Sequence, residues 1–117
     1  MYVKSNIGLN IREKSNGENA IRFFTERITE DALFLLDEPE NSLAPNRQLE
    51  LAQFLEEAAR FYRCQIVMAT HSPFLAAMKE AVVYDIDSRP AKIRNWYELQ
   101  GIKLYQKFFE ENRHYFR

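Results

Sequence analysis

The sequence predicts an α/β protein in which a mostly parallel sheet is flanked by helices. Two short apolar runs, Leu33–Leu36 and Cys64–Thr70, have the length and continuity of strands that are covered on both faces. The segment between them opens with Pro45 and carries apolar residues at helical spacing. Strands that alternate with helices in this way are typical of parallel sheets joined by right-handed crossovers.

The composition is that of a folded chain of one domain. Of its 117 residues, 46% are hydrophobic and 14% are aromatic, which argues against disorder. The net charge of -1 gives no overall basic field for nucleic acid. Cys64 is the single cysteine, so an internal disulfide is excluded and a core position is expected for it. No run approaches the ~20 apolar residues of a membrane helix. We expect a soluble cytoplasmic protein.

The amino-terminal segment predicts a loop followed by a helix. Residues 1–17 are polar and indicate a loop or a short edge strand. Residues 18–29 are expected to form a helix, because apolar side chains recur at helical spacing at Ile21, Phe24 and Ile28. Ser15, Asn16 and Gly17 lie where the cap of that helix should be.

The elements after the first strand follow in order. A helix is predicted from Pro45 to about Arg63, with an apolar stripe of Leu51, Leu55, Ala58 and Tyr62. After the second strand, Pro73 begins a short helix that we expect to reach about Lys79. Residues 81–86 predict a third strand of the same sheet, and residues 102–113 predict a helix. We treat residues 95–117 as the helical tail of a single domain, 1–117.

Polar side chains follow the first two predicted strands. Asp37 and Glu38 come after the first, and Thr70 and His71 close the second. The carboxyl ends of parallel strands meet at one edge, where ligands bind. Adjacent carboxylates repel each other unless a cation or a donor compensates. In phosphoryl-transfer enzymes, such an Asp holds Mg²⁺, the next residue can accept a proton from water, and a histidine can contact a phosphate.

Each of these features has a simpler explanation when it is taken alone. An Asp-Glu pair after an apolar run is commonly a solvated strand end, and His71 before Ser72-Pro73 is commonly a cap or turn residue. The Ser15-Asn16-Gly17-Glu18 stretch alone indicates a turn and a helix cap. The functional interpretation depends on the order and spacing of all three elements together.

Three segments resemble motifs of the ATP-binding-cassette (ABC) ATPase superfamily, whose fold is P-loop NTPase-like. "FLLDEPENSLAP" resembles its Walker B segment and D-loop, "IVMATHSP" resembles its H-loop strand, and "SNGEN" resembles its signature loop. Over residues 13–86 the sequence is more similar to soluble RecF-like or AAA-type ATPases than to transporter subunits.

The resemblance implies a role for each matching residue, with Mg²⁺ and ATP as cofactors. Asp37 would coordinate Mg²⁺ through water, Glu38 would be the general base, and His71 would contact the γ-phosphate. Ser15, Gly17 and Glu18, at a helix amino terminus, would bind the nucleotide held by a second subunit. Ser42 and Leu43 would lie in the D-loop at the subunit interface, which implies a homo-oligomer.

The sequence also departs from the family pattern. It contains no G-x-x-x-x-G-K-[ST] loop, and its three glycines are too scattered to cradle phosphates. Lys14 stands where the signature usually begins with Leu, and Ala44 or Pro45 where many D-loops carry Asp. We therefore expect the C-terminal half of a cassette, inactive alone, whose partner is a Walker A-bearing half or a second subunit.

Two other functions remain open. The chain could be an interaction module that keeps the fold without turnover. It could also be a nucleic-acid-binding accessory protein, because basic and aromatic side chains cluster at Arg89, Lys92, Arg94, Trp96 and Tyr97. A solvated face explains this small cluster more simply, since phosphate binding normally uses a wider basic footprint.

Overall fold

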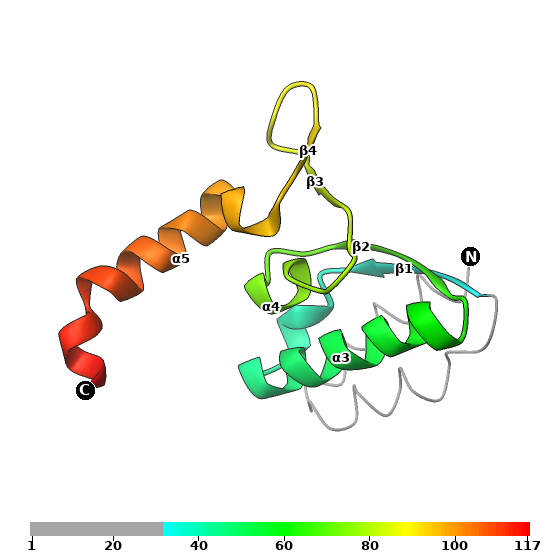
Figure 1. Cartoon of the computed structure of the whole chain (residues 1–117), viewed down its shortest axis with the longest axis horizontal. Helices are drawn as coiled ribbons and strands as arrows, with labels where there is room; N and C mark the ends of the chain where they lie inside the picture. The colour runs from blue at the N-terminus through cyan, green and yellow to red at the C-terminus, as the bar shows by residue number, and fades with distance from the viewer. Residues whose placement is uncertain (1–31) are drawn as a thin grey trace. The chain divides into compact units, whose positions relative to one another are not determined.

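The computed structural model describes residues 32–117 (Figure 1). The described residues divide into two compact units, with the boundary between Lys79 and Glu80. The loop expected over residues 1–17 and the helix expected over residues 18–29 lie outside the described residues.

The first unit is built on a pair of parallel strands, as the sequence predicts. Strand β1 (Leu33–Asp37) pairs with strand β2 (Gln65–Ala69). The register runs from Leu33 opposite Gln65 to Asp37 opposite Ala69. The two strands therefore end level with each other, and the residues that follow them begin at the same edge.

Helix α3 (Pro45–Phe61) supplies more residues to the core than any other described element of this unit, and it runs along one side of the strand pair (Figure 1). Its buried residues are Leu51, Ala52, Leu55 and Ala58, and they cluster with Phe34 and Leu36 of β1. The predicted apolar stripe is confirmed except at Tyr62, which caps the helix and is 47% exposed. Cys64 is buried in the core, as expected.

Two short turns complete the edge where the strands end. The 3-10 turn η1 (Pro39–Ser42) follows β1, and helix α4 (Pro73–Ala76) follows β2. Helix α4 ends at Ala76, before the end that the sequence predicted near Lys79. The backbone N–H of Lys79 donates to the Glu56 carboxylate of α3 at 2.7 Å, so it does not continue the helix.

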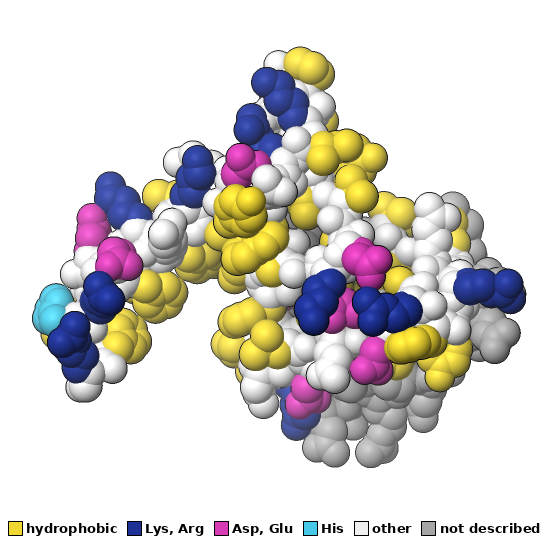
Figure 2. Space-filling view, viewed as in Figure 1, with side chains coloured by type: hydrophobic (Ala, Val, Ile, Leu, Met, Phe, Trp, Pro, Cys, Tyr) yellow, Lys and Arg dark blue, Asp and Glu magenta, His cyan; other side chains and the backbone are white. Residues whose placement is uncertain are grey.

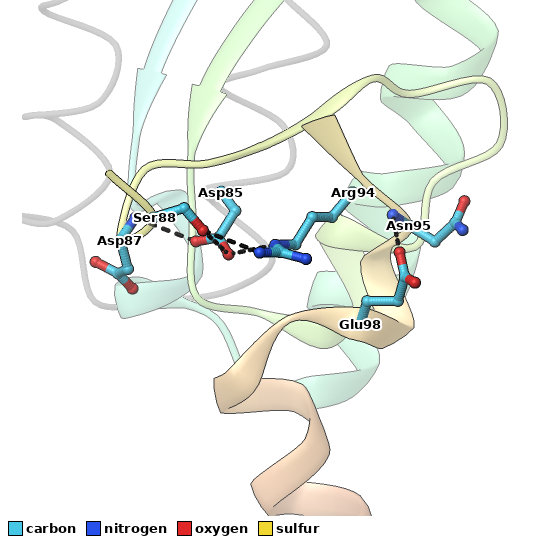
Figure 3. Close-up of polar contacts among 6 residues, drawn as sticks. All are labelled: Asp85, Asp87, Ser88, Arg94, Asn95 and Glu98. Carbon is cyan, nitrogen blue, oxygen red and sulfur yellow. Dashed lines mark hydrogen bonds and ion pairs between the residues drawn. The ribbon is translucent and has the colours of Figure 1, made fainter. Parts of the chain in front are cut away.

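The second unit corrects the prediction of a third parallel strand. Strand β3 (Val83–Asp85) pairs antiparallel with strand β4 (Lys92–Arg94), and the two form a separate hairpin. Arg94 Nε donates to Asp85 Oδ2 at 2.9 Å, so a side-chain bond also joins the two strands (Figure 3). Strand β3 therefore pairs with a strand that lies close to it in the sequence, and the sequence pattern did not indicate that strand.

The rest of the second unit is helical. The turn η2 (Trp96–Glu98) precedes helix α5 (Gln100–Glu111) and the turn η3 (Arg113–Phe116). The backbone N–H of Asn95 donates to Glu98 Oε1 at 2.9 Å, which closes a capping box on η2 (Figure 3). Helix α5 lies within two residues of its predicted position. None of the helices between residues 32 and 117 is long and apolar enough to span a membrane.

Candidate functional site

The parallel strands bring the predicted general base and the predicted phosphate-binding histidine together. The backbone N–H of Glu38 donates to the carbonyl of Ala69 at 2.7 Å, which extends the strand pairing by one residue. Oε1 of Glu38 lies 3.9 Å from Nδ1 of His71. The side chain of His71 is 85% exposed and that of Glu38 is 39% exposed. The predicted convergence of the two strand ends is confirmed, and both side chains are open to a ligand.

The backbone of Glu38 is left-handed, with φ 47° and ψ 56°. For a residue with a Cβ this conformation costs about 1–2 kcal/mol. The surrounding structure enforces it, because Glu38 is bonded to Ala69 on one side and its carbonyl accepts the N–H of Asn41 at 3.2 Å on the other. Pro39 is fully buried just after it. Such enforced strain in a residue other than glycine clusters at functional sites.

Glu40 is the residue of this edge that the sequence interpretation missed. Its Oε1 accepts a hydrogen bond from the hydroxyl of Thr70 at 2.6 Å, and its Oε2 accepts the backbone N–H of His71 at 2.8 Å. The signal in the sequence is a third carboxylate in the "DEPEN" segment, close to Asp37 and Glu38. Without the position of Thr70, that carboxylate looks like an ordinary solvated turn residue.

A second polar link holds the segment after β2 against α3. The buried hydroxyl of Ser72 donates to Oε1 of Gln48 at 2.6 Å and accepts the N–H of Leu75 at 3.3 Å, capping α4. Nε2 of Gln48 donates to the carbonyl of Leu43 at 3.0 Å. One amide of α3 therefore fixes both the segment after β1 and the segment after β2.

The side chains at this edge suit a divalent cation. Ligand atoms of Glu38, Glu40 and His71 all lie within 4.8 Å of one another. Carboxylate oxygens are the ligands that Mg²⁺ prefers, and a carboxylate and imidazole set also suits Mn²⁺. Asp37, the predicted metal ligand, is exposed at the end of β1 and is not among these three residues. The donor chemistry therefore fits the predicted cofactor.

The other predicted site residues have different surroundings. Ser42 is partly exposed at the end of η1, where a partner could reach it. Leu43 is buried in the core, so its side chain does not face a partner as the resemblance implied. Ser15, Gly17 and Glu18 lie outside the described residues, and their expected contact with nucleotide stays a prediction.

The basic cluster of the second unit is smaller than the sequence suggested. Figure 2 shows Lys and Arg side chains gathered over the β3–β4 hairpin. Arg94 belongs to that cluster, but its guanidinium donates to Asp85 at 2.9 Å and to the Ser88 hydroxyl at 3.2 Å (Figure 3). This ion pair offsets the charge of Arg94. Arg89 and Lys92 are exposed and remain open to anions.

The same contacts lower the pKa of Asp85 from its ordinary value of 3.8. The largest cause is the hydrogen bond from the Ser88 hydroxyl to Oδ2, at 3.0 Å. The backbone N–H of Asp87 and the guanidinium of Arg94 act in the same direction, against the effect of desolvation. The hairpin therefore holds this carboxylate in its ionised form.

Comparisons with known proteins identify a family. A family model described as "AAA domain, putative AbiEii toxin, Type IV TA system" matches residues 4–77. No curated protein matches the chain, and no solved structure matches it. The matched residues include β1, α3, β2 and the whole edge that carries Glu38 and His71. Because the match covers more than half of the sequence, this chain belongs to that family of AAA, P-loop NTPase-type domains.

Proposed function

We propose that the edge formed by Asp37, Glu38 and His71 is the hydrolytic side of an Mg²⁺–ATP site of the ABC type. The single observation that carries this proposal is the 3.9 Å approach of Glu38 Oε1 to His71 Nδ1 at the carboxyl ends of two parallel strands. Open α/β sheets bind ligands at this edge. Membership in an AAA-domain family supports a nucleotide as the ligand.

Each residue has a distinct part in the proposed reaction. Asp37 would hold Mg²⁺ through water, and the bound ion would offset the negative charge that develops on the phosphates. Glu38 accepts a proton from the attacking water as general base. His71 donates a hydrogen bond to an oxygen of the γ-phosphate. The enforced backbone of Glu38 favours this role, because catalysis of this kind depends on positioning.

The remaining contacts to the phosphates would come from elsewhere. The 117 residues contain no G-x-x-x-x-G-K-[ST] loop, whose backbone and lysine hold phosphates in P-loop enzymes. We place that loop on a separate Walker A-bearing segment or subunit. Ser15, Gly17, Glu18 and Ser42 of a second copy would close the site from the other side, which makes the working unit a homo-oligomer.

The experiment supplies the missing loop and then removes the base. The chain is fused to the Walker A-bearing segment of another member of its family, and phosphate release from Mg²⁺–ATP is measured. Glu38→Gln should lower kcat about 10²–10⁴-fold, as loss of a general base does, while ATP remains bound. Asp37→Asn should instead raise the Mg²⁺ concentration needed for half-maximal activity.

Glu57→Gln is the matched control, since Glu57 is an exposed carboxylate on α3 away from the edge. It should leave activity unchanged. In an active fusion, equal and mild effects of the Glu38 and Asp37 substitutions would show that both carboxylates are structural. That result would overturn the proposal.

A further inference from the structure

We propose that Glu40 is a positioning residue that holds His71 beside Glu38, a role that rests on the function proposed for this edge. The carboxylate of Glu40 reaches across from η1 to the segment after β2. One oxygen accepts the Thr70 hydroxyl at 2.6 Å, and the other accepts the His71 backbone N–H at 2.8 Å. A single side chain thus joins the segment that carries the proposed general base to the segment that carries the histidine proposed to bind the γ-phosphate.

The anchor acts on the backbone of His71 because its imidazole has little packing of its own. That side chain is 85% exposed, so burial does not determine its direction. A backbone N–H bonded to a carboxylate is a charge-assisted hydrogen bond, which is about twice as strong as a neutral one. Fixing this N–H limits the positions open to the Cα atom of His71, and hence to its ring.

The same carboxylate organises the next residue indirectly. The hydroxyl of Thr70, which donates to Glu40, accepts the backbone N–H of Ser72 at 3.0 Å. Ser72 has a second anchor in Gln48, at 2.6 Å. Loss of Glu40 should therefore release His71 while Ser72 and α4 stay in place. This difference separates a positioning role from a general contribution to folding.

Glu40 also links His71 to the expected subunit interface. Glu40 and Ser42 belong to the same turn, η1, and Glu38 caps its amino-terminal end. A displacement of this turn by a partner at Ser42 would move the carboxylate that holds His71. Glu38 and His71 would then shift together, which suits two groups that serve one phosphate.

The first measurement is hydrogen exchange in the full chain labelled with ¹⁵N. In Glu40→Ala, the His71 amide should exchange about tenfold faster, because it loses a hydrogen bond to a charged group. Glu40→Gln should fall between this variant and the wild type, since an amide offers one accepting oxygen in place of two. The Leu75 amide, which Ser72 holds, should keep its rate in both variants. Glu57→Gln serves as the control and should change neither.

The second measurement uses Mn²⁺ alone and the ring protons of the two histidines. In the wild type, Mn²⁺ should broaden the His71 ring signals and leave those of His114, in η3, sharp. Glu40 is also one of the three residues that could bind the ion, so Glu40→Ala can lower the broadening at both Glu38 and His71. If Glu40 positions His71, the broadening of the His71 ring should fall at least twofold more than that of the Glu38 amide. A merely structural role would lower both together or neither.

Unchanged exchange and unchanged His71 broadening in a folded Glu40→Ala chain would overturn the positioning role. If Glu40→Ala fails to fold, the same two readings on Glu40→Gln decide the question. Absence of Mn²⁺ broadening at both Glu38 and His71 in the wild type would instead count against the proposed nucleotide site. The exchange rates alone would then test whether Glu40 holds the backbone of His71.

Discussion

Glu38 and His71 face each other across the end of a parallel strand pair, with Oε1 and Nδ1 3.9 Å apart. The approach follows from the register, because Asp37 lies opposite Ala69 and the chain continues from each strand at the same level. Glu40 then ties the two continuing segments together through Thr70 and His71. The proposed hydrolytic site depends on this arrangement.

The isolated chain should not turn over ATP and should bind it weakly. In the proposed function its residues would supply a general base and a hydrogen-bond donor to the γ-phosphate, but the sequence lacks the loop that neutralises and orients the β- and γ-phosphates. Phosphate release and nucleotide binding should be measured in the presence of Mg²⁺. Turnover at an ordinary enzyme rate, abolished by Glu38→Gln, would mean that the chain holds phosphates by a route we have not recognised.

The left-handed backbone of Glu38 predicts an unusual order of stabilities. At φ 47° glycine is unstrained and alanine is not, so Glu38→Gly should be more stable than Glu38→Ala by about 1 kcal/mol. Denaturant unfolding of the two variants measures the difference. The matched pair Glu57→Gly and Glu57→Ala, in the interior of α3, should show the reverse order. A less stable glycine at both positions would disprove strain at Glu38.

The hairpin of the second unit should lose stability in acid. The pKa of Asp85 is lowered in the folded chain, so its ionised form stabilises the hairpin at pH values above the ordinary 3.8. That contribution disappears as the pH falls below 3.8 and through the lowered pKa. Asp85→Asn should remove this part of the pH dependence, because asparagine does not titrate.

Amide shifts of Ser88 and Arg94, followed from pH 6 to pH 2, would measure this transition. Asp87→Asn is the control, since the Asp87 backbone N–H, and not its side chain, contacts Asp85. An Asp85 titration at or above its ordinary value would refute the contribution of the Ser88 and Arg94 contacts.

Helix α5 should promote association of the isolated chain. Figure 2 shows charged side chains along one side of α5 and hydrophobic ones along another. Phe108 is 57% exposed and Phe109 is 51% exposed. Exposed apolar patches of this kind commonly mark interfaces. Sedimentation at several concentrations should show association that weakens when both residues are changed to serine.

A control with Lys103→Ser, on the same helix, should associate as the wild type does. A monomeric wild type at every concentration would contradict the prediction. If association survives the Phe108→Ser and Phe109→Ser changes, the interface lies on another surface, such as the one around the exposed Val67 of β2.

The parts of the fold that depend on local pattern could be predicted from the sequence. The run Leu33–Leu36 and the apolar residues of α3 each match one period, and the structure confirms both elements. Their alternation also gave the parallel pairing, and with it the meeting of Glu38 and His71 at one edge. Topology was sufficient here because parallel strands leave their carboxyl ends on the same side.

Features that depend on which residues meet in the folded chain could not be predicted. Strand β3 pairs antiparallel with β4, and an apolar run alone does not reveal which strand it pairs with or in which direction. Glu40 looks like a solvated carboxylate until Thr70 and His71 are known to lie across from it. The sequence also does not show where α3 ends. Tyr62 continues the helical spacing of the apolar stripe, but the helix stops at Phe61.

The most direct test of the proposed site is a map of Mn²⁺-induced broadening over the amide signals of the ¹⁵N-labelled chain. Mn²⁺ replaces Mg²⁺ as a paramagnetic ion that accepts the same oxygen ligands. We predict that the strongest broadening falls on Asp37, Glu38 and His71, and that Asp37→Asn reduces it. Broadening centred on Asp85 and Asp87 of the hairpin, with none at the end of β1, would contradict the account.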